Sequence, residues 1–215
     1  AINIFEPQSL DEYIGQEQSK ILIQIMLQAA AQEQRVIPNI LLTGSAGLGK
    51  TTLAKIIYSG QLFTLLDGNA INNIYEALSG YVIIDEIHNV KPEICDSLNV
   101  KLDDGIINII GCTTNPGKLP SPFRSRFRTL NLVRYTEDDL VQIMKNVLKR
   151  KKSLHIEDKF LIEIAKRGRN TPRFALHTLS MVMDVMLVKK EQRLNDNSFY
   201  EALTLLEIDD KGLLE

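Results

Sequence analysis

The sequence is poor in cysteine and has no apolar stretch long enough to cross a membrane. Its 2 cysteines, Cys95 and Cys112, have neither metal-site nor redox-pair spacing, which argues against a disulfide framework. Cys112 ends the apolar run 106–111, which predicts a small buried core residue. Because no signal peptide is present either, we expect a cytoplasmic protein without a membrane partner.

The chain also lacks an excess of charge of either sign. Its formal net charge is -2, so the molecule as a whole has no nucleic-acid signature. Positive charge is nevertheless concentrated in two segments, 118–134 and 145–173. Such patches can serve phosphate groups, and a solvated face is the alternative for the second segment. A hydrophobic fraction of 44% and a charged fraction of 24% are ordinary for a globular chain of one or two domains.

A phosphate-binding loop is the strongest motif. Residues 44–51 fit the pattern G-x-x-x-x-G-K-[ST] at every fixed position. Glycines let backbone N–H groups point at an anion, and the following helix presents its positive end to it. We expect Lys50 to reach the outer phosphates and the Thr51 hydroxyl to ligate Mg²⁺. The predicted nucleotide-binding residues here are Gly44, Ser45, Ala46, Gly47, Leu48, Gly49, Lys50, Thr51 and Thr52.

The surroundings of this loop favour phosphate binding over a chance glycine-rich turn. The apolar run 40–42 precedes the loop, as a buried strand would. Residues 52–58 follow it with a spacing that is compatible with a helix. The expected strand, loop and helix therefore stand in the order that the motif needs.

A second apolar run, 81–86, ends in two acidic residues. Continuous apolar sequence is typical of a strand buried on both faces of a parallel sheet, whose carboxyl end is where ligands bind. Asp85 is therefore predicted to hold the hydrated Mg²⁺, and Glu86 to be the general base that polarises the attacking water. An acid pair that only caps a loop is the alternative.

The remaining elements predict two domains. Up to residue 133 we expect an α/β nucleotide-binding domain, and residues 134–209 are expected to be helical only. One helix, 16–34, has a predicted apolar face made of Ile21, Ile25, Met26, Ala29 and Ala30. The other predicted elements are strands at 62–66, 106–112 and 130–133, helices at 70–78, 92–101, 136–150, 157–167, 172–188 and 197–206, and an irregular connection at 119–128.

Taken together, these motifs resemble the AAA+ ATPases and, more narrowly, the RuvB family of Holliday-junction branch-migration motors. The resemblance implies a P-loop AAA+ large domain with a parallel central sheet, followed by a small all-α lid domain. The similar stretches run in order through nearly the whole chain. They are Leu10–Gln16, Gly44–Ala54, Asp85–His88, Gly111–Thr114, Ser121–Phe127 and Arg169–Arg173.

The resemblance implies an adenine pocket and a first sensor. Tyr13 and Ile14, with Pro172, would bracket the adenine. The residues alone allow another interpretation, in which Tyr13 and Ile14 pin the N-terminus to the core. Thr114 falls at the family's first sensor, and Asn115 is the second choice.

The resemblance also implies two arginine roles. Arg126 matches the arginine finger, which reaches the γ-phosphate bound to a neighbouring subunit, and Arg124 is the second choice. A solvated loop charge is the alternative for Arg126. Arg173 matches the second sensor, on the lid. A finger that acts in trans implies a ring or stack of subunits.

The chain departs from the family pattern between Asp85 and Thr113. RuvB proteins carry a longer insertion there, a β-hairpin that engages the partner RuvA, whereas 101–106 reads here as a bare turn. Residues 210–215 look like the start of a linker to the family's winged-helix domain, which this sequence does not contain. These departures concern RuvA binding and branch migration rather than ATP hydrolysis.

We therefore expect a Mg-ATP-dependent, self-associating motor of the RuvB type that acts on DNA in four-way-junction branch migration, recombination and repair. A junction-binding protein or a replicative helicase is the expected kind of protein partner. The alternative is a phage- or plasmid-type loader or adaptor whose ATP binding controls assembly on a protein partner. Ring size, the DNA structure acted on and the partner's identity do not follow from the sequence.

Overall fold

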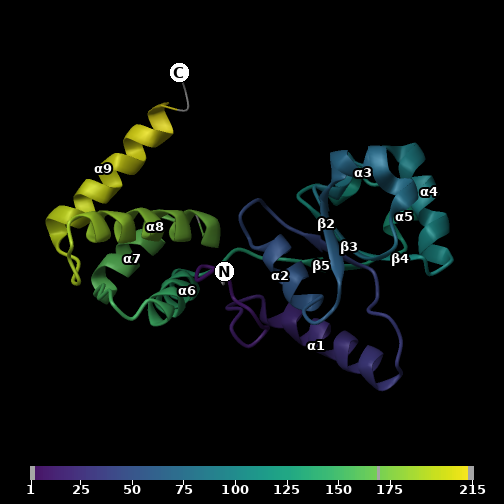
Figure 1. The fold of residues 1–215 in the computed structure, drawn as a ribbon, viewed down its shortest axis with the longest axis horizontal. Coiled ribbons are helices and arrows are strands. Elements are labelled where there is room, and N and C mark those ends of the chain that lie inside the picture. Colours follow the sequence, from purple (N-terminus) through teal and green to yellow (C-terminus); the bar gives the residue numbers. More distant parts are fainter. Residues whose placement is uncertain (1–2, 169, 213–215) are drawn as a thin grey trace. The chain divides into compact units, whose positions relative to one another are not determined.

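The computed structural model describes residues 3–168 and 170–212. It divides into two compact units, Gln8–Val133 and Arg134–Glu215, and the second unit also takes in Ala1–Pro7. The described strands all lie in Gln8–Val133, as Figure 1 shows. We describe each unit by itself.

Gln8–Val133 is built on one parallel sheet of 5 strands in the order β2-β3-β4-β1-β5. Every neighbouring pair is parallel, which confirms the predicted parallel central sheet. Thr43 stands opposite Thr113 on one side and Asn131 on the other, and its hydroxyl is hydrogen-bonded to the Asn131 side chain. The strands are β1 (Ile40–Thr43), β2 (Phe63–Asp67), β3 (Gly80–Asp85), β4 (Ile107–Thr113) and β5 (Arg128–Asn131).

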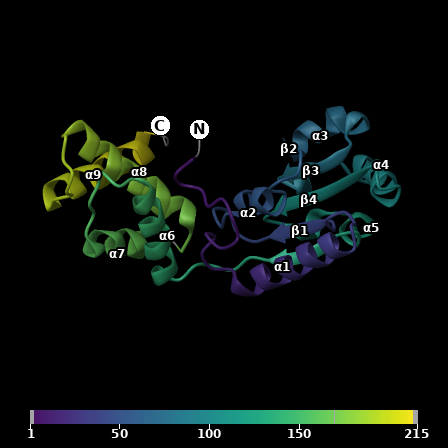
Figure 2. The ribbon, with the colours of Figure 1, turned by 60° about the horizontal axis from the view of Figure 1, so that its bottom comes forward.

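Helices connect these strands, and local sequence signals begin them. Asp67 caps α3 by accepting a 2.8 Å hydrogen bond from Asn69 N, and Pro92 opens α4 where its missing N–H costs nothing. Helix α2 packs against β1, β3 and β4 near the middle of the sheet, and Figure 2 shows it from a second direction. The helices are α1 (Glu17–Gln32), α2 (Lys50–Ile57), α3 (Gly68–Ile74), α4 (Pro92–Asp103) and α5 (Ser121–Arg124), with 3₁₀ turns η1 (Tyr75–Ala77), η2 (Ile87–Asn89) and η3 (Pro116–Lys118).

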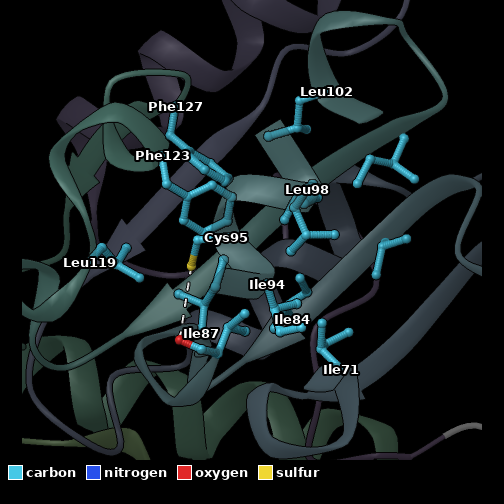
Figure 3. Packing of buried hydrophobic residues seen from close by; sticks show 14 of the residues in the cluster. Ile71, Ile84, Ile87, Ile94, Cys95, Leu98, Leu102, Leu119, Phe123 and Phe127 are labelled. Carbon is cyan, nitrogen blue, oxygen red and sulfur yellow. Dashed lines mark hydrogen bonds between the residues drawn. The ribbon is translucent and has the colours of Figure 1, made fainter. Parts of the chain in front are cut away.

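The main hydrophobic cluster fastens α4, α5 and η2 to one face of the sheet (Figure 3). Phe123 and Phe127 meet edge to face, with ring centroids 5.1 Å apart, above Cys95 of α4. Burial raises the pKa of the Cys95 thiol to about 11, as expected for an inert core residue. The cluster comprises Leu41, Ile71, Leu78, Val82, Ile84, Ile87, Val90, Ile94, Cys95, Leu98, Leu102, Ile107, Ile109, Leu119, Phe123 and Phe127.

The second unit is a group of packed helices. Its first helix begins with a capping box: the Asp139 N–H donates to the Thr136 hydroxyl and the Thr136 N–H to the Asp139 carboxylate. Arg150 holds Ile4, which belongs to this unit, because its Nη1 donates to the Ile4 carbonyl oxygen at 2.7 Å. Within the described ranges, no helix combines the length and the apolar character needed to cross a bilayer. The helices are α6 (Glu137–Arg150), α7 (Asp158–Arg167), α8 (Pro172–Val188) and α9 (Asp196–Gly212).

Several element boundaries differ from the sequence-based expectation, among them the following three. A short helix, α5, forms inside the segment 119–128 that was expected to be irregular, because Ser121 and Pro122 suit a helix start. Strand β5 begins at Arg128, before the predicted residue 130. Helix α9 continues to Gly212, into residues predicted to begin a linker; the rest of that stretch, 213–215, lies outside the described residues.

The predicted apolar face of α1 is partly wrong. Met26 and Ala30 are buried as predicted, but Ile21 and Ile25 are 56% and 58% exposed. The buried stripe runs instead through Ser19, Ile23, Met26 and Ala30. The helix carries apolar residues on more than one side, so its periodicity alone does not identify the packed face.

This correction predicts opposite results for two isoleucines of α1. Ile23→Ala removes a side chain that is 0% exposed and should lower the free energy of unfolding by about 2–5 kcal/mol. Ile25→Ala, at an exposed position of the same helix, should change it by less than about 0.5 kcal/mol. Urea denaturation of both variants measures the difference. A larger loss in the free energy of unfolding for Ile25→Ala than for Ile23→Ala would mean that the face predicted from the sequence is the packed one.

Candidate functional site

The phosphate-binding loop leaves the carboxyl end of β1. Gly47 and Gly49 have φ angles of 84° and 86°, a left-handed conformation that glycine adopts without strain. Gly49 precedes the first residue of α2, so the loop runs directly into the positive end of that helix. The backbone thus has the conformation that an anion cradle needs.

Lys50 lies inside the curve of this loop. Its side chain is buried, and its Nζ donates to the carbonyl oxygens of Gly44 at 2.7 Å and Ser45 at 2.8 Å. These bonds hold the ammonium group against the loop that is predicted to bind phosphates. Thr51 and Thr52 follow on α2 and are half-buried.

Tyr13 touches the same loop from the N-terminal segment. Its ring is buried, and its hydroxyl lies 3.3 Å from the carbonyl oxygen of Leu48 and 3.4 Å from that of Gly49. Lys20 donates from its Nζ to the Tyr13 carbonyl oxygen at 2.7 Å. These contacts match the alternative interpretation of the sequence, in which Tyr13 anchors the N-terminus to the core. Its neighbour Ile14 is half-buried.

Gln16 joins the N-terminal segment to the chain just beyond β5. Its Nε2 donates to the Val133 carbonyl oxygen at 2.7 Å, and its Oε1 accepts from the Val133 N–H at 2.9 Å. The side-chain amide therefore pairs with both backbone groups of one residue, as a neighbouring strand would. The sequence reveals only the Gln, because the partner lies far along the chain.

The two acids end β3 in a tightly constrained turn. The Glu86 N–H donates to Asp85 Oδ1 at 3.0 Å. Glu86 has a φ of 50°, a left-handed conformation that is costly for a residue with a side chain. Gly68 lies against it so closely that an added Cβ would be 2.2 Å from the Glu86 carbonyl oxygen. The backbone position of Glu86 is therefore set from two sides.

A chain of hydrogen bonds fixes the Glu86 side chain. Its Oε2 lies 3.1 Å from His88 Nε2, and His88 Nδ1 lies 2.7 Å from the Thr113 hydroxyl oxygen. Thr113, at the end of β4, is fully buried and accepts a 3.0 Å hydrogen bond from the Asn115 N–H. The His88 ring thus bridges the Glu86 carboxylate and the Thr113 hydroxyl, and its tautomer determines which ring nitrogen donates.

The threonine predicted as the first sensor, Thr114, is the neighbour of Thr113, which makes this contact. Thr114, predicted as the first sensor, is exposed in this structure, whereas Thr113 is in the hydrogen-bonded chain. Successive side chains of a strand point to opposite faces of the sheet. Which of the two threonines can reach His88 therefore depends on the face that each position presents, and the sequence alone does not show this. His88 was also missed as a functional residue; its spacing of two positions after Glu86 was the available signal.

Cys112 marks the place where the ends of β1, β3 and β4 meet. It is a fully buried free cysteine, as predicted. Burial raises the pKa of its thiol to about 12; the negative charge of Asp85 adds to the shift, and the positive charge of Lys50 and a hydrogen bond with Thr51 oppose it. Lys50 follows β1 and Asp85 ends β3, so the residues predicted to bind Mg-ATP lie at the carboxyl ends of the two strands that flank β4.

The two arginines of the segment 121–127 have different partners. Arg126 forms a bidentate ion pair with Asp103, with Nε to Oδ1 at 2.9 Å and Nη2 to Oδ2 at 2.8 Å. Arg124 donates from Nη1 to the Pro116 carbonyl oxygen at 3.2 Å. Asp103 stands in the predicted turn of 101–106, and no local pattern predicts its pairing with Arg126.

The predicted lid residues lie at the start of α8, in the helical unit. Pro172 is its first residue and is half-buried, and Arg173 is exposed. Thr171 precedes the helix with extended backbone angles. Arg169, which begins the similar stretch, lies outside the described residues.

These features define a class. A parallel sheet with a phosphate loop after β1, acids after β3 and a separate helical unit is the architecture of an AAA+ P-loop ATPase. Residues 5–110 match the family described as the Holliday junction DNA helicase RuvB P-loop domain, and residues 135–209 match the RuvB AAA lid domain. The chain belongs to the RuvB family of ATPases.

Individual relatives agree with this assignment. The chain is 35% identical over 249 aligned positions to the Holliday junction branch migration complex subunit RuvB of Thermotoga maritima, covering 100% of this chain and 73% of that protein. The RuvB subunit of Thermotoga petrophila gives the same identity and coverage. A solved structure of the Thermotoga maritima RuvB branch migration motor superposes with a TM-score of 0.85 at 35% identity, covering 98% of this chain and 76% of that one. These findings confirm the family predicted from the motifs.

The contact between Gly68 and Glu86 makes a prediction about stability. Gly68→Ala places a methyl group against the Glu86 carbonyl oxygen and should lower the free energy of unfolding by about 1–3 kcal/mol. Alanine favours helices over glycine, so propensity alone predicts the opposite sign at this first residue of α3. Gly117→Ala is the control, since the added Cβ would lie 3.5 Å from Asn115 Oδ1, an ordinary contact distance. Equal urea midpoints for the two variants would contradict the close approach.

Proposed function

We propose that this chain is a magnesium-dependent ATPase motor that assembles into a ring or stack and acts on DNA at four-way junctions. The observation that carries the proposal is that the phosphate loop, with Lys50 held against it, and the acids Asp85 and Glu86 lie at the carboxyl ends of β1 and β3, the two strands that flank β4. Family membership supports it, because the matched relatives are named as subunits of a Holliday junction branch migration complex.

In the proposed mechanism, the loop Gly44–Thr51 binds the phosphates of ATP. Backbone N–H groups and the start of α2 favour the negative charge. Lys50 then exchanges its bonds to the Gly44 and Ser45 carbonyls for phosphate oxygens. Its burial strengthens this interaction, since charges attract more strongly away from water.

Thr51 and Asp85 are proposed to hold Mg²⁺. A hydroxyl and a carboxylate are hard oxygen donors, and Mg²⁺ takes its other ligands from water and phosphate. Two protein oxygens do not complete an octahedral shell, so these donors fit an ion that shares its coordination with the phosphates of a nucleotide. When bound, the ion would neutralise charge on the phosphates.

Glu86 is proposed to orient the attacking water. The carboxylate leaves one oxygen for that role, because Oε2 faces His88. Thr113 fixes the other side of the imidazole, so the position of the base is coupled to the end of β4. Thr114, next along the chain, is proposed as the first sensor of the γ-phosphate.

The remaining proposed roles involve other parts of the protein. Arg126 is proposed as the finger that reaches the γ-phosphate bound by a neighbouring copy, with Arg124 as the second choice. Arg173 is proposed as the second sensor. Tyr13, Ile14 and Pro172 are proposed to bracket the adenine.

Glu86→Gln tests the base. The variant should bind ATP with nearly unchanged affinity, because the phosphate contacts come from the loop and glutamine keeps the size of the side chain, and its turnover should fall by about 10²–10⁴-fold. Fluorescent-nucleotide titration and steady-state phosphate release measure the two quantities. Glu93→Gln, which removes the same charge from the exposed start of α4, should keep normal turnover. Normal turnover by Glu86→Gln would refute the assignment.

A DNA comparison tests the motor against the loader. For a junction motor, a four-way junction should raise the ATPase rate of this chain several-fold more than plain duplex of equal length and concentration. For a nucleotide-switched loader, neither DNA should be preferred. The loader gains no support from the comparisons, since both matched domains are those of RuvB. The measurement needs a stated salt concentration, because phosphate contacts weaken steeply with salt.

A further inference from the structure

Asp103 and Arg126 come from separate elements that the main hydrophobic cluster holds together. Asp103 is the last residue of α4, and Arg126 follows α5. Their neighbours Leu102 and Phe127 are both buried in that cluster (Figure 3). The backbones beneath the two side chains are therefore fixed by core packing rather than by the ion pair.

The Arg126 guanidinium is held in one orientation by three bonds. Asp103 accepts from Nε and Nη2, and the Pro122 carbonyl oxygen accepts from Nη1 at 2.6 Å. A guanidinium carries five N–H donors in a rigid plane. Within the described residues, this arrangement leaves two donors for another partner, one on each terminal nitrogen.

The pair is poorly suited to stabilising the fold. The Arg126 side chain is 29% exposed and that of Asp103 58% exposed. Exposed ion pairs contribute little to stability, because water screens them and long side chains lose freedom. A bidentate pair does, however, determine the plane of the guanidinium. The hydrogen bond from Arg126 also lowers the pKa of Asp103, so the carboxylate stays ionised at neutral pH.

We propose that Asp103 is a positioning residue that holds the Arg126 guanidinium ready to donate to the nucleotide of a second copy of this chain. The inference rests on the proposed function, in which Arg126 acts in trans. Asp103 and Pro122 set the direction of the donors that remain, and the neighbouring copy receives them without first having to order a long side chain. Asp103 itself touches no substrate.

A mixing experiment defines the reference behaviour. Arg126→Ala subunits lack the finger and Lys50→Ala subunits lack a working phosphate loop, and each type carries what the other is missing. Mixing the two inactive proteins should restore part of the ATPase activity. If Arg126→Ala alone keeps full activity, or the mixture shows none at any ratio, then the proposed function fails and Asp103 has nothing to position.

Asp103→Asn tests the inference against this reference. The variant should lose about 10- to 100-fold in kcat, up to the loss that a misplaced catalytic group causes, with ATP affinity within about twofold of the original. Its activity should recover on mixing with Lys50→Ala subunits, which supply an intact finger, and not with Arg126→Ala subunits. In a background of Arg126→Ala, the change at Asp103 should cause no further loss.

Two matched variants separate positioning from charge. Asp104→Asn removes the same charge from the adjacent exposed position and should keep normal kcat. Asp103→Glu, which retains a carboxylate, should recover most of the activity. The inference is overturned if Asp103→Asn has normal or higher kcat while Arg126→Ala is impaired, or if Asp104→Asn loses as much. A higher kcat would mean that the ion pair sequesters the arginine instead.

Discussion

The parallel pairing of β1 with β4, and of β4 with β3, is the constraint on which the site depends. Thr43 stands opposite Thr113, and Ile84 stands opposite Gly111, so the three strands finish at one edge of the sheet. The phosphate loop, the acid pair and the Thr113 hydroxyl all leave the sheet there. A slip of one residue in β4 would turn Thr113 to the opposite face and remove the partner of His88. Strand register therefore determines the catalytic geometry as well as the core.

The site combines a strained backbone with a rigid support. Glu86 adopts a left-handed conformation, which costs a residue with a side chain about 1–3 kcal/mol. The next residue, Ile87, is fully buried in the main cluster and packs against Gly111. A Cβ added at Gly111 would lie 2.7 Å from Ile87 Cδ1. Packing of Ile87 thus offsets the strain at Glu86, and the glycine at position 111 makes room for that packing.

Motifs that span only a few residues could be identified from the sequence, whereas contacts between distant elements could not. The phosphate loop and the acid pair at the end of β3 each depend on residues within a few positions, and both lie on the elements expected. The packed face of α1 was misjudged because Ile21 and Ile25 are as apolar as the buried Ile23. The links Thr113–His88 and Asp103–Arg126 join separate elements, so only the folded backbone brings them together.

The side-chain amide of Gln16 connects the N-terminal segment to the point where the chain leaves the sheet. Val133 is the last residue of the α/β unit, and both of its backbone hydrogen-bonding groups are engaged by Gln16. The same N-terminal segment carries Tyr13, whose hydroxyl meets the carbonyls of Leu48 and Gly49. A change of backbone angle at Val133 therefore has to break these two hydrogen bonds or move Gln16 with it. The chain's exit from the sheet and the phosphate loop are thus both hydrogen-bonded to one short stretch, residues 13–16.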